Sequence, residues 1–466
     1  MRLLTKNRGF LPATSDAVVS ASLKPAVYDM ASLGSIDDST ILDHKSLESL
    51  ARLLGKERVD ILFIGHYNAG RSTLEKHILE VTWAADRDTA ELEGEMTTSN
   101  KTKRFETDNR RYTIMREPGP KNYKPDRIQD ADVAVLIVSA IESEFEEGCQ
   151  TNGQTQSHAI IARDMGINKL IVAVNKMDDS TVGWSKERYD KIVTELSSFL
   201  KDNRYDVEND VIFVPISENT HVNIKVRVDP GTCDWYTGVS LLDCLDSIHL
   251  RGRKLNAPFR FPIRRIDKDM GIVVEGKIVT GFVKKGMHVL VMPNAEAATI
   301  DTILNEIGDE VQLAGAGDTI RLLIPGIARM ASEFPAKLNI MPGVVLCHPK
   351  NPVPVVSRFK AEIRIVDSKC IICEGLKAVL HIHAAVVEIT LSMILHRVDE
   401  STGRTSKKPP LFLKMGQHGI VVIETERLIC AETFAKSPRM GLFSIKDEGK
   451  TVAVGRVKSL LCVEQK

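Results

Sequence analysis

Four apolar runs separated by longer amphipathic stretches are the feature that most restricts how residues 58–252 can fold. The runs read "VDILFI", "DVAVLIVSA", "KLIVAVNKM" and "DVIFVPIS", and one intervening stretch is "SKERYDKIVTELSSFLK". Near-continuous runs of β-branched residues are typical of strands buried on both faces, and helix-like stretches between them favour parallel neighbours. We therefore predict an α/β domain in which helices cover both faces of a mostly parallel sheet.

A different pattern begins near residue 258. Short runs of Val, Ile and Leu, such as "GIVVEGKIV" and "KKGMHVLVMP", are separated by Gly, Pro, Asn and Asp, which is typical of antiparallel barrels. A proline-rich stretch at 347–359 connects two such regions. The predicted organisation is a weakly structured leader at 1–57 with one short helix, an α/β domain at 58–252, and β-barrels at 253–350 and 351–466.

Composition excludes several classes of protein. Lys+Arg and Asp+Glu both number 62 in 466 residues, so the chain is not a generally basic nucleic-acid coat. No apolar run reaches the ~20 residues that cross a bilayer, and eight cysteines are too few for a disulfide scaffold, which indicates a reduced, cytoplasmic setting. Cys370 and Cys373 have C-x-x-C spacing without a second pair, so we interpret them as part of a buried strand.

A glycine-rich loop follows the first apolar run. Residues 65–73 read "GHYNAGRST", which matches the phosphate-binding pattern G-x-x-x-x-G-K-[ST] except that arginine stands at the lysine position. A strand, a glycine-rich loop and a helix in this order can turn backbone N–H groups toward phosphates, with Ser72 offering its hydroxyl to Mg²⁺. The alternative is an ordinary glycine turn. The residues predicted to hold phosphates are Gly65, Asn68, Gly70, Arg71, Ser72 and Thr73.

A second motif lies about a hundred residues further on. Asn175, Lys176 and Asp178 form an N-K-x-D arrangement directly after an apolar run. In such an arrangement the aspartate accepts hydrogen bonds from guanine N1–H and the exocyclic amine, two donors that adenine does not present together. The asparagine braces the site and the lysine stem packs on the base. Ser217, at the end of the next run, is expected to hold the loop on the guanine side.

The order of these motifs resembles that of the translational GTPases related to elongation factor Tu. Within them the chain is most similar to the eukaryotic class II release-factor GTPases, in the stretches "GHYNAGRST", "GQTQSHA", "LIVAVNKMDDSTVGWSKERYD", "DMGIVVEGKI", "KAVLHIHA" and "KDEGKTVAVGRV". The resemblance implies a P-loop GTPase domain followed by two antiparallel β-barrels, binding GTP or GDP with Mg²⁺. It also implies that the factor assists a stop-codon-reading partner at the ribosome, as a monomer in a hetero-complex.

Several departures from the family pattern lie where Mg²⁺ and the γ-phosphate would be held. The family reads D-x-P-G-H where this chain reads "REPGP", so Arg116 replaces an aspartate and Pro120 replaces the histidine that positions the attacking water. Proline has no side-chain hydrogen-bonding group. Thr102 is the candidate for the switch threonine. These substitutions leave no catalytic residue of the family intact. We therefore expect the chain to bind guanine nucleotides and to hydrolyse GTP weakly.

Other residues have local interpretations. His381 and His383 have strand spacing and are expected to pack in the barrel rather than to bind metal, and 399–410 is expected to form a solvated hairpin loop. Arg404, Lys407 and Lys408 in that loop are candidates for contact with ribosomal RNA. The stretch 440–457 resembles the strand pair at which the stop-codon-reading partner docks in the family, although ordinary barrel strands fit its pattern as well.

Three functions are consistent with this pattern. The first is a release-factor-type GTPase that uses its nucleotide state to deliver a stop-codon-reading partner through the last barrel. The second is a non-catalytic pseudo-GTPase adapter that keeps the fold and the partner surface. The third is an elongation-factor-type carrier of aminoacyl-tRNA, which the release-factor stretches in both barrels make the weakest of the three.

Overall fold

The computed structural model describes most of the chain in nine segments, and all of them lie in the compact unit formed by residues 40–466. The described segments are residues 44–83, 103–116, 130–150, 153–250, 254–267, 273–325, 342–366, 371–399 and 402–461.

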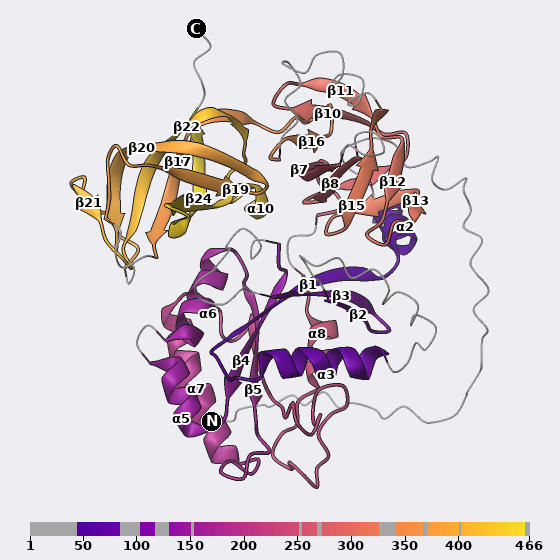
Figure 1. The fold of residues 1–466 in the computed structure, drawn as a ribbon, viewed down its shortest axis with the longest axis vertical. Coiled ribbons are helices and arrows are strands. Elements are labelled where there is room, and N and C mark those ends of the chain that lie inside the picture. Colours follow the sequence, from indigo (N-terminus) through magenta and orange to yellow (C-terminus); the bar gives the residue numbers. More distant parts are fainter. Residues whose placement is uncertain are drawn as a thin grey trace, which may run out of the picture. The chain divides into compact units, whose positions relative to one another are not determined.

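A six-stranded sheet organises the α/β domain (Figure 1). Its strand order is β2-β3-β1-β4-β5-β6, and every neighbouring pair is parallel except β2 with β3. The strands are β1 (Glu57–Gly65), β2 (Lys103–Glu106), β3 (Arg110–Arg116), β4 (Val133–Ser139), β5 (Lys169–Asn175) and β6 (Val211–Pro215). The helices are α2 (His44–Leu54), α3 (Arg71–Trp83), α5 (Glu142–Cys149), α6 (Gln154–Asp164), α7 (Lys186–Asp202) and α8 (Leu241–Ser247). The predicted mostly parallel sheet is confirmed.

The middle of the chain folds as antiparallel strands. An eight-stranded sheet has the order β11-β10-β16-β7-β8-β15-β12-β13, and β14 pairs separately with β9. The strands are β7 (Arg260–Asp267), β8 (Val273–Lys277), β9 (Phe282–Lys284), β10 (His288–Met292), β11 (Glu296–Thr299), β12 (Thr302–Leu304), β13 (Glu310–Val311), β14 (Leu313–Gly315), β15 (Thr319–Leu323) and β16 (Val345–Cys347). Helix α2 contacts β14, where the side chain of Leu54 lies against Gly315.

The C-terminal region is a closed antiparallel barrel in the order β17-β22-β20-β19-β23-β24. Its elements are β17 (Val355–Ile365), β18 (Ile372–Cys373), β19 (Lys377–Ile382), β20 (Ala385–Val398), β21 (Phe412–Leu413), β22 (His418–Cys430), α10 (Pro438–Gly441), β23 (Leu442–Asp447) and β24 (Lys450–Leu461). The alternating burial along these strands produces one apolar interior, so the predicted all-β second half of the chain is confirmed.

Two local expectations in this barrel need correction. His383 lies in the turn after β19 at φ +42°, where its Nε2 pairs with the Cys430 carbonyl oxygen at 2.8 Å, so it does not share a strand face with His381. Cys373 is exposed at the end of the two-residue strand β18, which pairs with β21. Ile372 and Cys373 thus form a two-residue strand rather than part of a long buried one. Cys370 lies outside the described residues.

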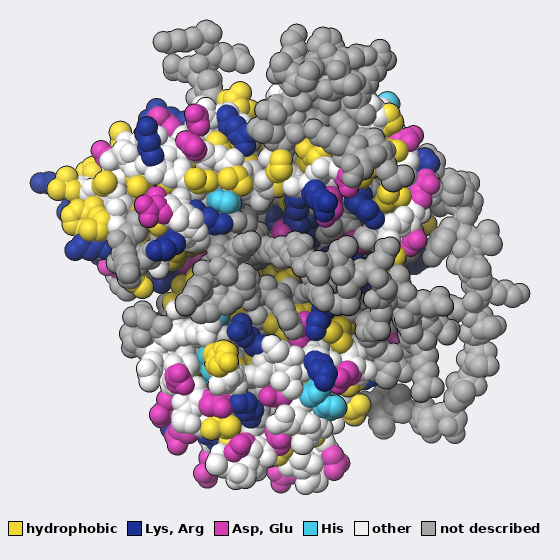
Figure 2. Space-filling view, viewed as in Figure 1, with side chains coloured by type: hydrophobic (Ala, Val, Ile, Leu, Met, Phe, Trp, Pro, Cys, Tyr) yellow, Lys and Arg dark blue, Asp and Glu magenta, His cyan; other side chains and the backbone are white. Residues whose placement is uncertain are grey.

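The surface carries both signs of charge. On the face drawn in Figure 2, the described Lys and Arg side chains are interspersed with Asp and Glu side chains, in keeping with the equal totals of the two classes. None of the helices in the described segments combines the length and the apolar character needed to span a bilayer.

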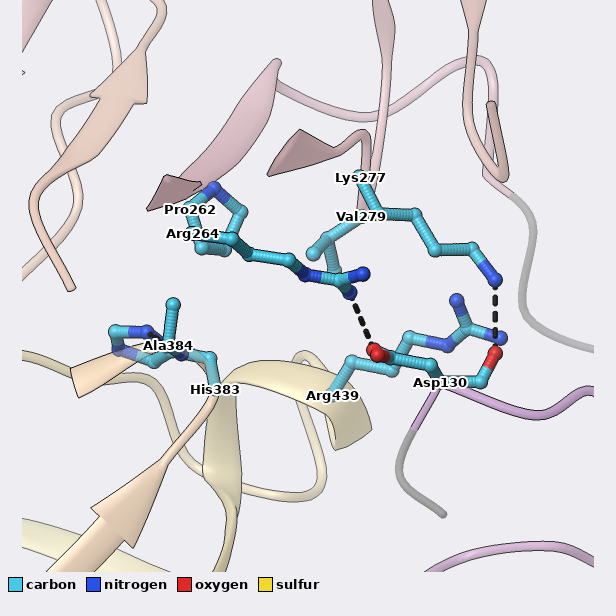
Figure 3. A pocket seen from close by; sticks show the side chains of 8 residues that line it. All are labelled: Asp130, Pro262, Arg264, Lys277, Val279, His383, Ala384 and Arg439. Carbon is cyan, nitrogen blue, oxygen red and sulfur yellow. Dashed lines mark hydrogen bonds and ion pairs between the residues drawn. The ribbon is translucent and has the colours of Figure 1, made fainter. Parts of the chain in front are cut away.

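Charged side chains from three regions of the chain meet around a small cavity of about 20 Å³ (Figure 3). The ammonium group of Lys277 on β8 pairs with the carboxylate of Asp60 on β1 and donates to the carbonyl oxygen of Asp130 at 2.8 Å. Arg439 of α10 pairs with Asp132, whose carboxylate also accepts from the Asp60 backbone N–H at 2.9 Å. Lys277 is only 1% exposed, so these carboxylates are what keep its charge compatible with burial.

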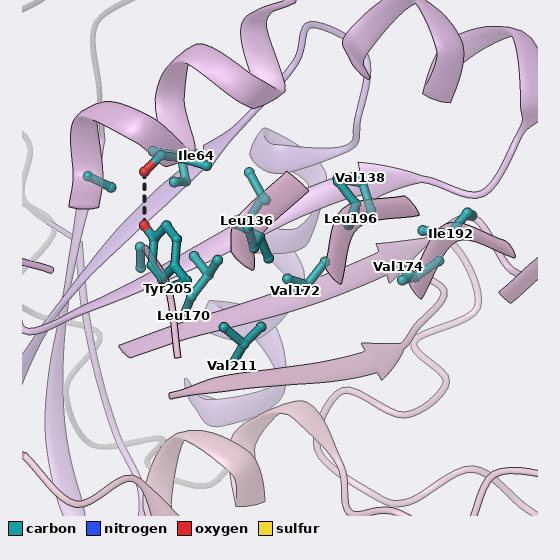
Figure 4. Close-up of a cluster of buried hydrophobic side chains, with 14 of the residues drawn as sticks. Ile64, Leu136, Val138, Leu170, Val172, Val174, Ile192, Leu196, Tyr205 and Val211 are labelled. Carbon is teal, nitrogen blue, oxygen red and sulfur yellow. Dashed lines mark hydrogen bonds between the residues drawn. The ribbon is translucent and has the colours of Figure 1, made fainter. Parts of the chain in front are cut away.

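The sheet of the α/β domain carries an apolar core on each face. Successive strand residues alternate between the two cores, so that Leu62 and Ile64 face helices α5, α6 and α7, whereas Ile61 and Phe63 face α3 and α8. Figure 4 shows the first core, where the Tyr205 hydroxyl donates to the Ala159 carbonyl oxygen at 2.9 Å. Burial on both faces explains the continuous apolar runs in the sequence and holds the carboxyl ends of the strands in place.

Candidate nucleotide-binding site

Three loops meet at the carboxyl edge of the parallel sheet. One loop joins β1 to α3, the second follows β5 at Asn175, and the third follows β6 at Ser217. Open α/β sheets bind ligands at this edge, because the loops there converge and helix N-termini point toward it. The structure thus brings together the two sequence motifs that lie a hundred residues apart.

The loop from Gly65 to Arg71 contains three residues with positive φ angles, a conformation that most residues other than glycine avoid. Gly65 has φ +146°, and a Cβ added there would lie 2.2 Å from the Ile137 carbonyl oxygen. Asn68 and Gly70 have φ +66° and +94°, and the first turn of α3 begins with Leu74 N–H donating to Gly70 O at 2.9 Å. Left-handed residues alternating with ordinary ones form the concave loop of N–H groups that suits an anion. This geometry favours the phosphate loop over an ordinary glycine turn.

Asn175 connects two of the loops. Its side-chain amide donates to the Ala69 carbonyl oxygen at 2.8 Å, and its carbonyl oxygen accepts from the Glu218 backbone N–H at 3.0 Å. The residue is fully buried. One side-chain amide therefore connects the glycine-rich loop to the loop after β6, which is a contact that the bracing role predicted for Asn175 requires.

Asp178 carries an unused acceptor. Its Oδ1 atom is buried and has no hydrogen-bond partner among the described residues. A buried carboxylate oxygen without a donor is costly, and such atoms are rare in folded proteins. A hydrogen-bond donor of a bound ligand would therefore have an acceptor available at Asp178 Oδ1.

Lys176 adopts a left-handed backbone at φ +63°, and its ammonium group is held by Glu144 of α5. The two Nζ–Oε distances are 3.0 and 2.8 Å. Burial opposes the ionisation of Glu144, but the bonds from Lys176 and Ser139 outweigh it and lower the pKa of this carboxyl group. This ion pair orients the Lys176 stem along the site.

Glu218 is a site residue that the sequence motifs do not include. Its carboxylate lies against the phosphate loop, since a Cβ added at Gly70 would be 2.3 Å from its Oε1. The side chain is 3% exposed, and its Oε2 has no hydrogen-bond partner among the described residues. Burial raises the pKa of Glu218 to about 7, with Asp178 and Glu144 adding to the rise and Lys176 opposing it. The signal in the sequence is an acidic residue directly after Ser217, at the end of a buried strand.

We expect the affinity for a nucleotide to fall as the pH rises through about 7, because ionised Glu218 repels phosphates bound at the adjacent loop. Glu218→Gln removes the charge and keeps the shape. The variant is expected to bind GDP about tenfold more tightly than the native chain at pH 8 and with a flatter pH profile.

Fluorescence titration of a labelled GDP between pH 6 and 8 measures both quantities. Glu208→Gln, at an exposed position before the amino end of β6, is the matched control and should retain the native pH profile. A native profile in Glu218→Gln would show that this carboxyl group does not act on the phosphates.

Two buried histidines flank the phosphate loop. Burial lowers the pKa of His66, and burial together with the charge of Arg71 lowers the pKa of His158 to about 4, so both rings are neutral at pH 7. His66 Nδ1 lies 3.2 Å from Thr155 Oγ1, and His158 Nδ1 lies 3.1 Å from the Gly65 carbonyl oxygen. A cavity of about 260 Å³ adjoins the loop here. It is lined by His66, Tyr67, Asn68, Glu144, Glu147, Gly148 and Gln154.

The other predicted residues fall in three groups. Ser72 is exposed and Thr73 is half-buried in the first turn of α3. Ser217 is fully buried, and its hydroxyl accepts from the Thr220 backbone N–H at 3.1 Å, which closes the turn after β6. Pro120, Thr102 and the side chain of Arg116 lie outside the described residues.

The residues present fit a guanine nucleotide at the base and the phosphates. The orphaned Oδ1 of Asp178 matches the donor edge of guanine, and Asn68 and Gly70 have the positive φ angles of an anion-binding loop. Among the described residues, the predicted ligand for Mg²⁺ is the exposed hydroxyl of Ser72. The strand order, the three loops and the β-rich second half define the class of elongation factor Tu-like GTP-binding proteins.

Comparisons with known proteins agree with this class. The elongation factor Tu GTP binding domain matches residues 56–251, and the GTP-eEF1A C-terminal domain-like family matches residues 358–458. The solved structure of the S. cerevisiae Ski7 GTPase-like domain, bound to GTP, has a TM-score of 0.62 over 89% of this chain and 99% of that one, and its 18% identity makes this a likeness of fold.

Two named relatives identify the family. The eukaryotic peptide chain release factor GTP-binding subunit of Kluyveromyces lactis is 42% identical over 436 residues, and its Schizosaccharomyces pombe counterpart is 38% identical over 488. The matches cover 87% and 98% of this chain and 61% and 72% of the two relatives. The chain belongs to the family of eukaryotic peptide chain release factor GTP-binding subunits. It spans about three fifths of the length of the K. lactis relative.

Proposed function

We propose that the chain is a guanine-nucleotide-binding factor of translation termination, which assists a stop-codon-reading partner at the ribosome and hydrolyses GTP slowly. The observation that carries the nucleotide part is the buried Oδ1 of Asp178, an acceptor without a donor beside the braced Asn175. The names of the K. lactis and S. pombe relatives support the assignment to termination.

Each element of the site has a role in this proposal. Asp178 accepts from the guanine N1–H and the exocyclic amine, and it rejects adenine because adenine N1 is itself an acceptor. The backbone N–H groups from Gly65 to Ser72 and the N-terminus of α3 hold the phosphates. Ser72 gives its hydroxyl to Mg²⁺, which neutralises phosphate charge when bound. Glu144 holds Lys176 in an orientation that lets its stem cover the base.

Slow hydrolysis follows from three substitutions. Phosphoryl transfer by this class of protein depends on positioning and charge stabilisation around the metal and the attacking water. Pro120 has no group to orient a water, and Arg116 places a positive charge where the family supports a cation. Arg71 keeps the charge of the family lysine but replaces a point charge with a planar fork.

Nucleotide titration with and without Mg²⁺ tests this function. If the chain switches between nucleotide states, we expect it to bind GTP more tightly than ATP and to bind GTP more tightly when Mg²⁺ is present. A GTP affinity that does not change with Mg²⁺ would favour the pseudo-GTPase adapter. Equal affinities for GTP and ATP would overturn the proposal. Ribosome-stimulated GTP turnover at the rate of a family member with an intact D-x-P-G-H segment would contradict slow hydrolysis.

We infer that the partner docks on the last barrel, at the β23–β24 hairpin. Truncation after residue 430 is an unsuitable test, because it removes both strands and opens the closed barrel. The exposed turn offers charge reversals that spare the fold, Glu448→Lys and Lys450→Glu. Capture of the stop-codon-reading factor should be lost in the double variant and retained in Lys285→Glu, an exposed position in the turn after β9. Full capture by the double variant would move the docking site elsewhere.

A further inference from the structure

Two histidines and a glutamate meet on the surface of the α/β domain, between helix α3 and the segment that follows β6. His77 and Glu80 stand three residues apart on α3, a spacing that places them on the same helix face. His221 comes from the segment after β6 and has φ +60°. The ring centroids of His77 and His221 are 4.0 Å apart at 56°, and His77 Nε2 lies 3.9 Å from Glu80 Oε2.

We propose that His77, Glu80 and His221 bind a divalent transition-metal ion of the Zn²⁺ type. Each residue offers one ligand atom, and these atoms all lie within 4.8 Å of one another. Zn²⁺ holds imidazole nitrogen and carboxylate oxygen at about 2.0–2.2 Å, so its ligand atoms are about 3.3 Å apart. Rotation of half-buried and exposed side chains closes the remaining distance. Two imidazoles and one carboxylate leave a fourth position for water.

The chemistry of the group favours a transition metal over Mg²⁺ or Ca²⁺. Imidazole suits Zn²⁺, Cu²⁺ and Ni²⁺, whereas Mg²⁺ and Ca²⁺ prefer sets of oxygen ligands. His77 Nδ1 is buried and has no hydrogen-bond partner among the described residues, so no hydrogen bond described there accounts for the orientation of this ring.

The two chain segments are held together without a metal. The Lys225 ammonium group donates to the Val81 carbonyl oxygen of α3 at 3.1 Å. Asn223 donates to Pro215 O at 2.8 Å, and Ser217 N–H donates to Val222 O at 3.2 Å, which together fix the segment that carries His221. Metal binding therefore needs side-chain rotation and little backbone movement, so the ordering cost is small.

Metal titration of the full chain, after removal of metals with a chelator, tests the site. Titration with Co²⁺ would report the coordination of the metal by visible absorption. Titration with Zn²⁺ in competition with a chromophoric chelator would measure the affinity. His77→Gln and His221→Asn each remove a ligand, and asparagine tolerates the positive φ at 221. Each variant is expected to lose one bound equivalent, and Glu80→Gln to weaken that equivalent at least about tenfold.

Cysteine thiolates are also ligands for these ions, so the metal binding of each variant is compared with that of a control variant. His249→Ala combined with His288→Ala removes two exposed histidines from other surfaces and is expected to retain the full stoichiometry. Zn²⁺ should also raise the Tm of the native chain more than that of His77→Gln. Circular dichroism without metal confirms that each variant folds. Equal stoichiometry and affinity in His77→Gln and the control variant would overturn the proposal.

Discussion

Asp178→Asn is expected to weaken GDP binding by about 10²–10⁴-fold. The variant loses a charged acceptor that, in the proposed function, takes two hydrogen bonds from guanine, each contributing about 1.5–3 kcal/mol. The amide presents one donor and one acceptor in place of two acceptors, which complements xanthine, where a carbonyl oxygen replaces the exocyclic amine. The same substitution is therefore expected to raise the affinity for xanthosine diphosphate while that for GDP falls.

Isothermal titration of both diphosphates measures this exchange of preference. Asp179→Asn is the matched control, since the Asp179 carboxylate is already engaged by Thr181 N–H at 2.9 Å and lies outside the N-K-x-D positions. It should leave both affinities near their native values. Loss of GDP binding in Asp178→Asn without a gain for xanthosine diphosphate would indicate a structural role for Asp178, and unchanged GDP binding would remove it from the site.

Lys277→Met is expected to destabilise the chain by about 3 kcal/mol at pH 7, because removing the buried ammonium group leaves two buried carboxylates less well compensated. The carboxylates of Asp60 and Asp132 both lie within 4 Å of the Lys277 ammonium group. Burial alone would raise the pKa of Asp60, but Lys277 and Arg58 outweigh it and lower the pKa.

The pH dependence of this loss has a defined sign. In the native chain Asp60 contributes stability above its unfolded-state pKa, and this stability is lost as the pH falls through the lower folded-state value. Without Lys277 the Asp60 carboxylate is protonated more readily, so the difference in Tm between native and variant chains should shrink as the pH falls from 7.5 toward the unfolded-state pKa of aspartate. Thermal unfolding measured at several pH values checks this. Lys285→Met breaks an exposed pair with Glu310, and since exposed ion pairs contribute little it should lower the Tm much less than Lys277→Met does. A similar cost for both variants would contradict the argument.

The fold could be predicted from the sequence because its signals are local and repeated. Strands buried on both faces produce continuous apolar runs, and all four runs proposed for the parallel sheet are strands in the structure. The glycine-rich loop and the N-K-x-D motif were recognisable for the same reason, since each occupies a short, uninterrupted stretch.

The remaining site residues could not be found in this way, because their partners are distant in the chain. Glu144 lies 32 residues from Lys176, and nothing near either residue in the sequence indicates their ion pair. Glu218 acquires its raised pKa mainly from burial, and its carboxylate lies against Gly70, which is 148 positions earlier in the chain. His77 and His221 are 144 positions apart and come together through the pairing of β5 with β6 and the packing of α3. Sequence patterns report local conformation, whereas these contacts depend on the assembled sheet.

The two bonds of Asn175 bear on how a nucleotide leaves the protein. Because one amide joins Ala69 to the backbone of Glu218, the loop proposed to hold the phosphates cannot move far without displacing the loop after β6, which lies on the proposed guanine side. Dissociation should then be a single concerted opening instead of a stepwise release that starts at one end. An exchange partner that pushed on either loop alone would accelerate the departure of the whole nucleotide, and Asn175→Ala would uncouple the two loops.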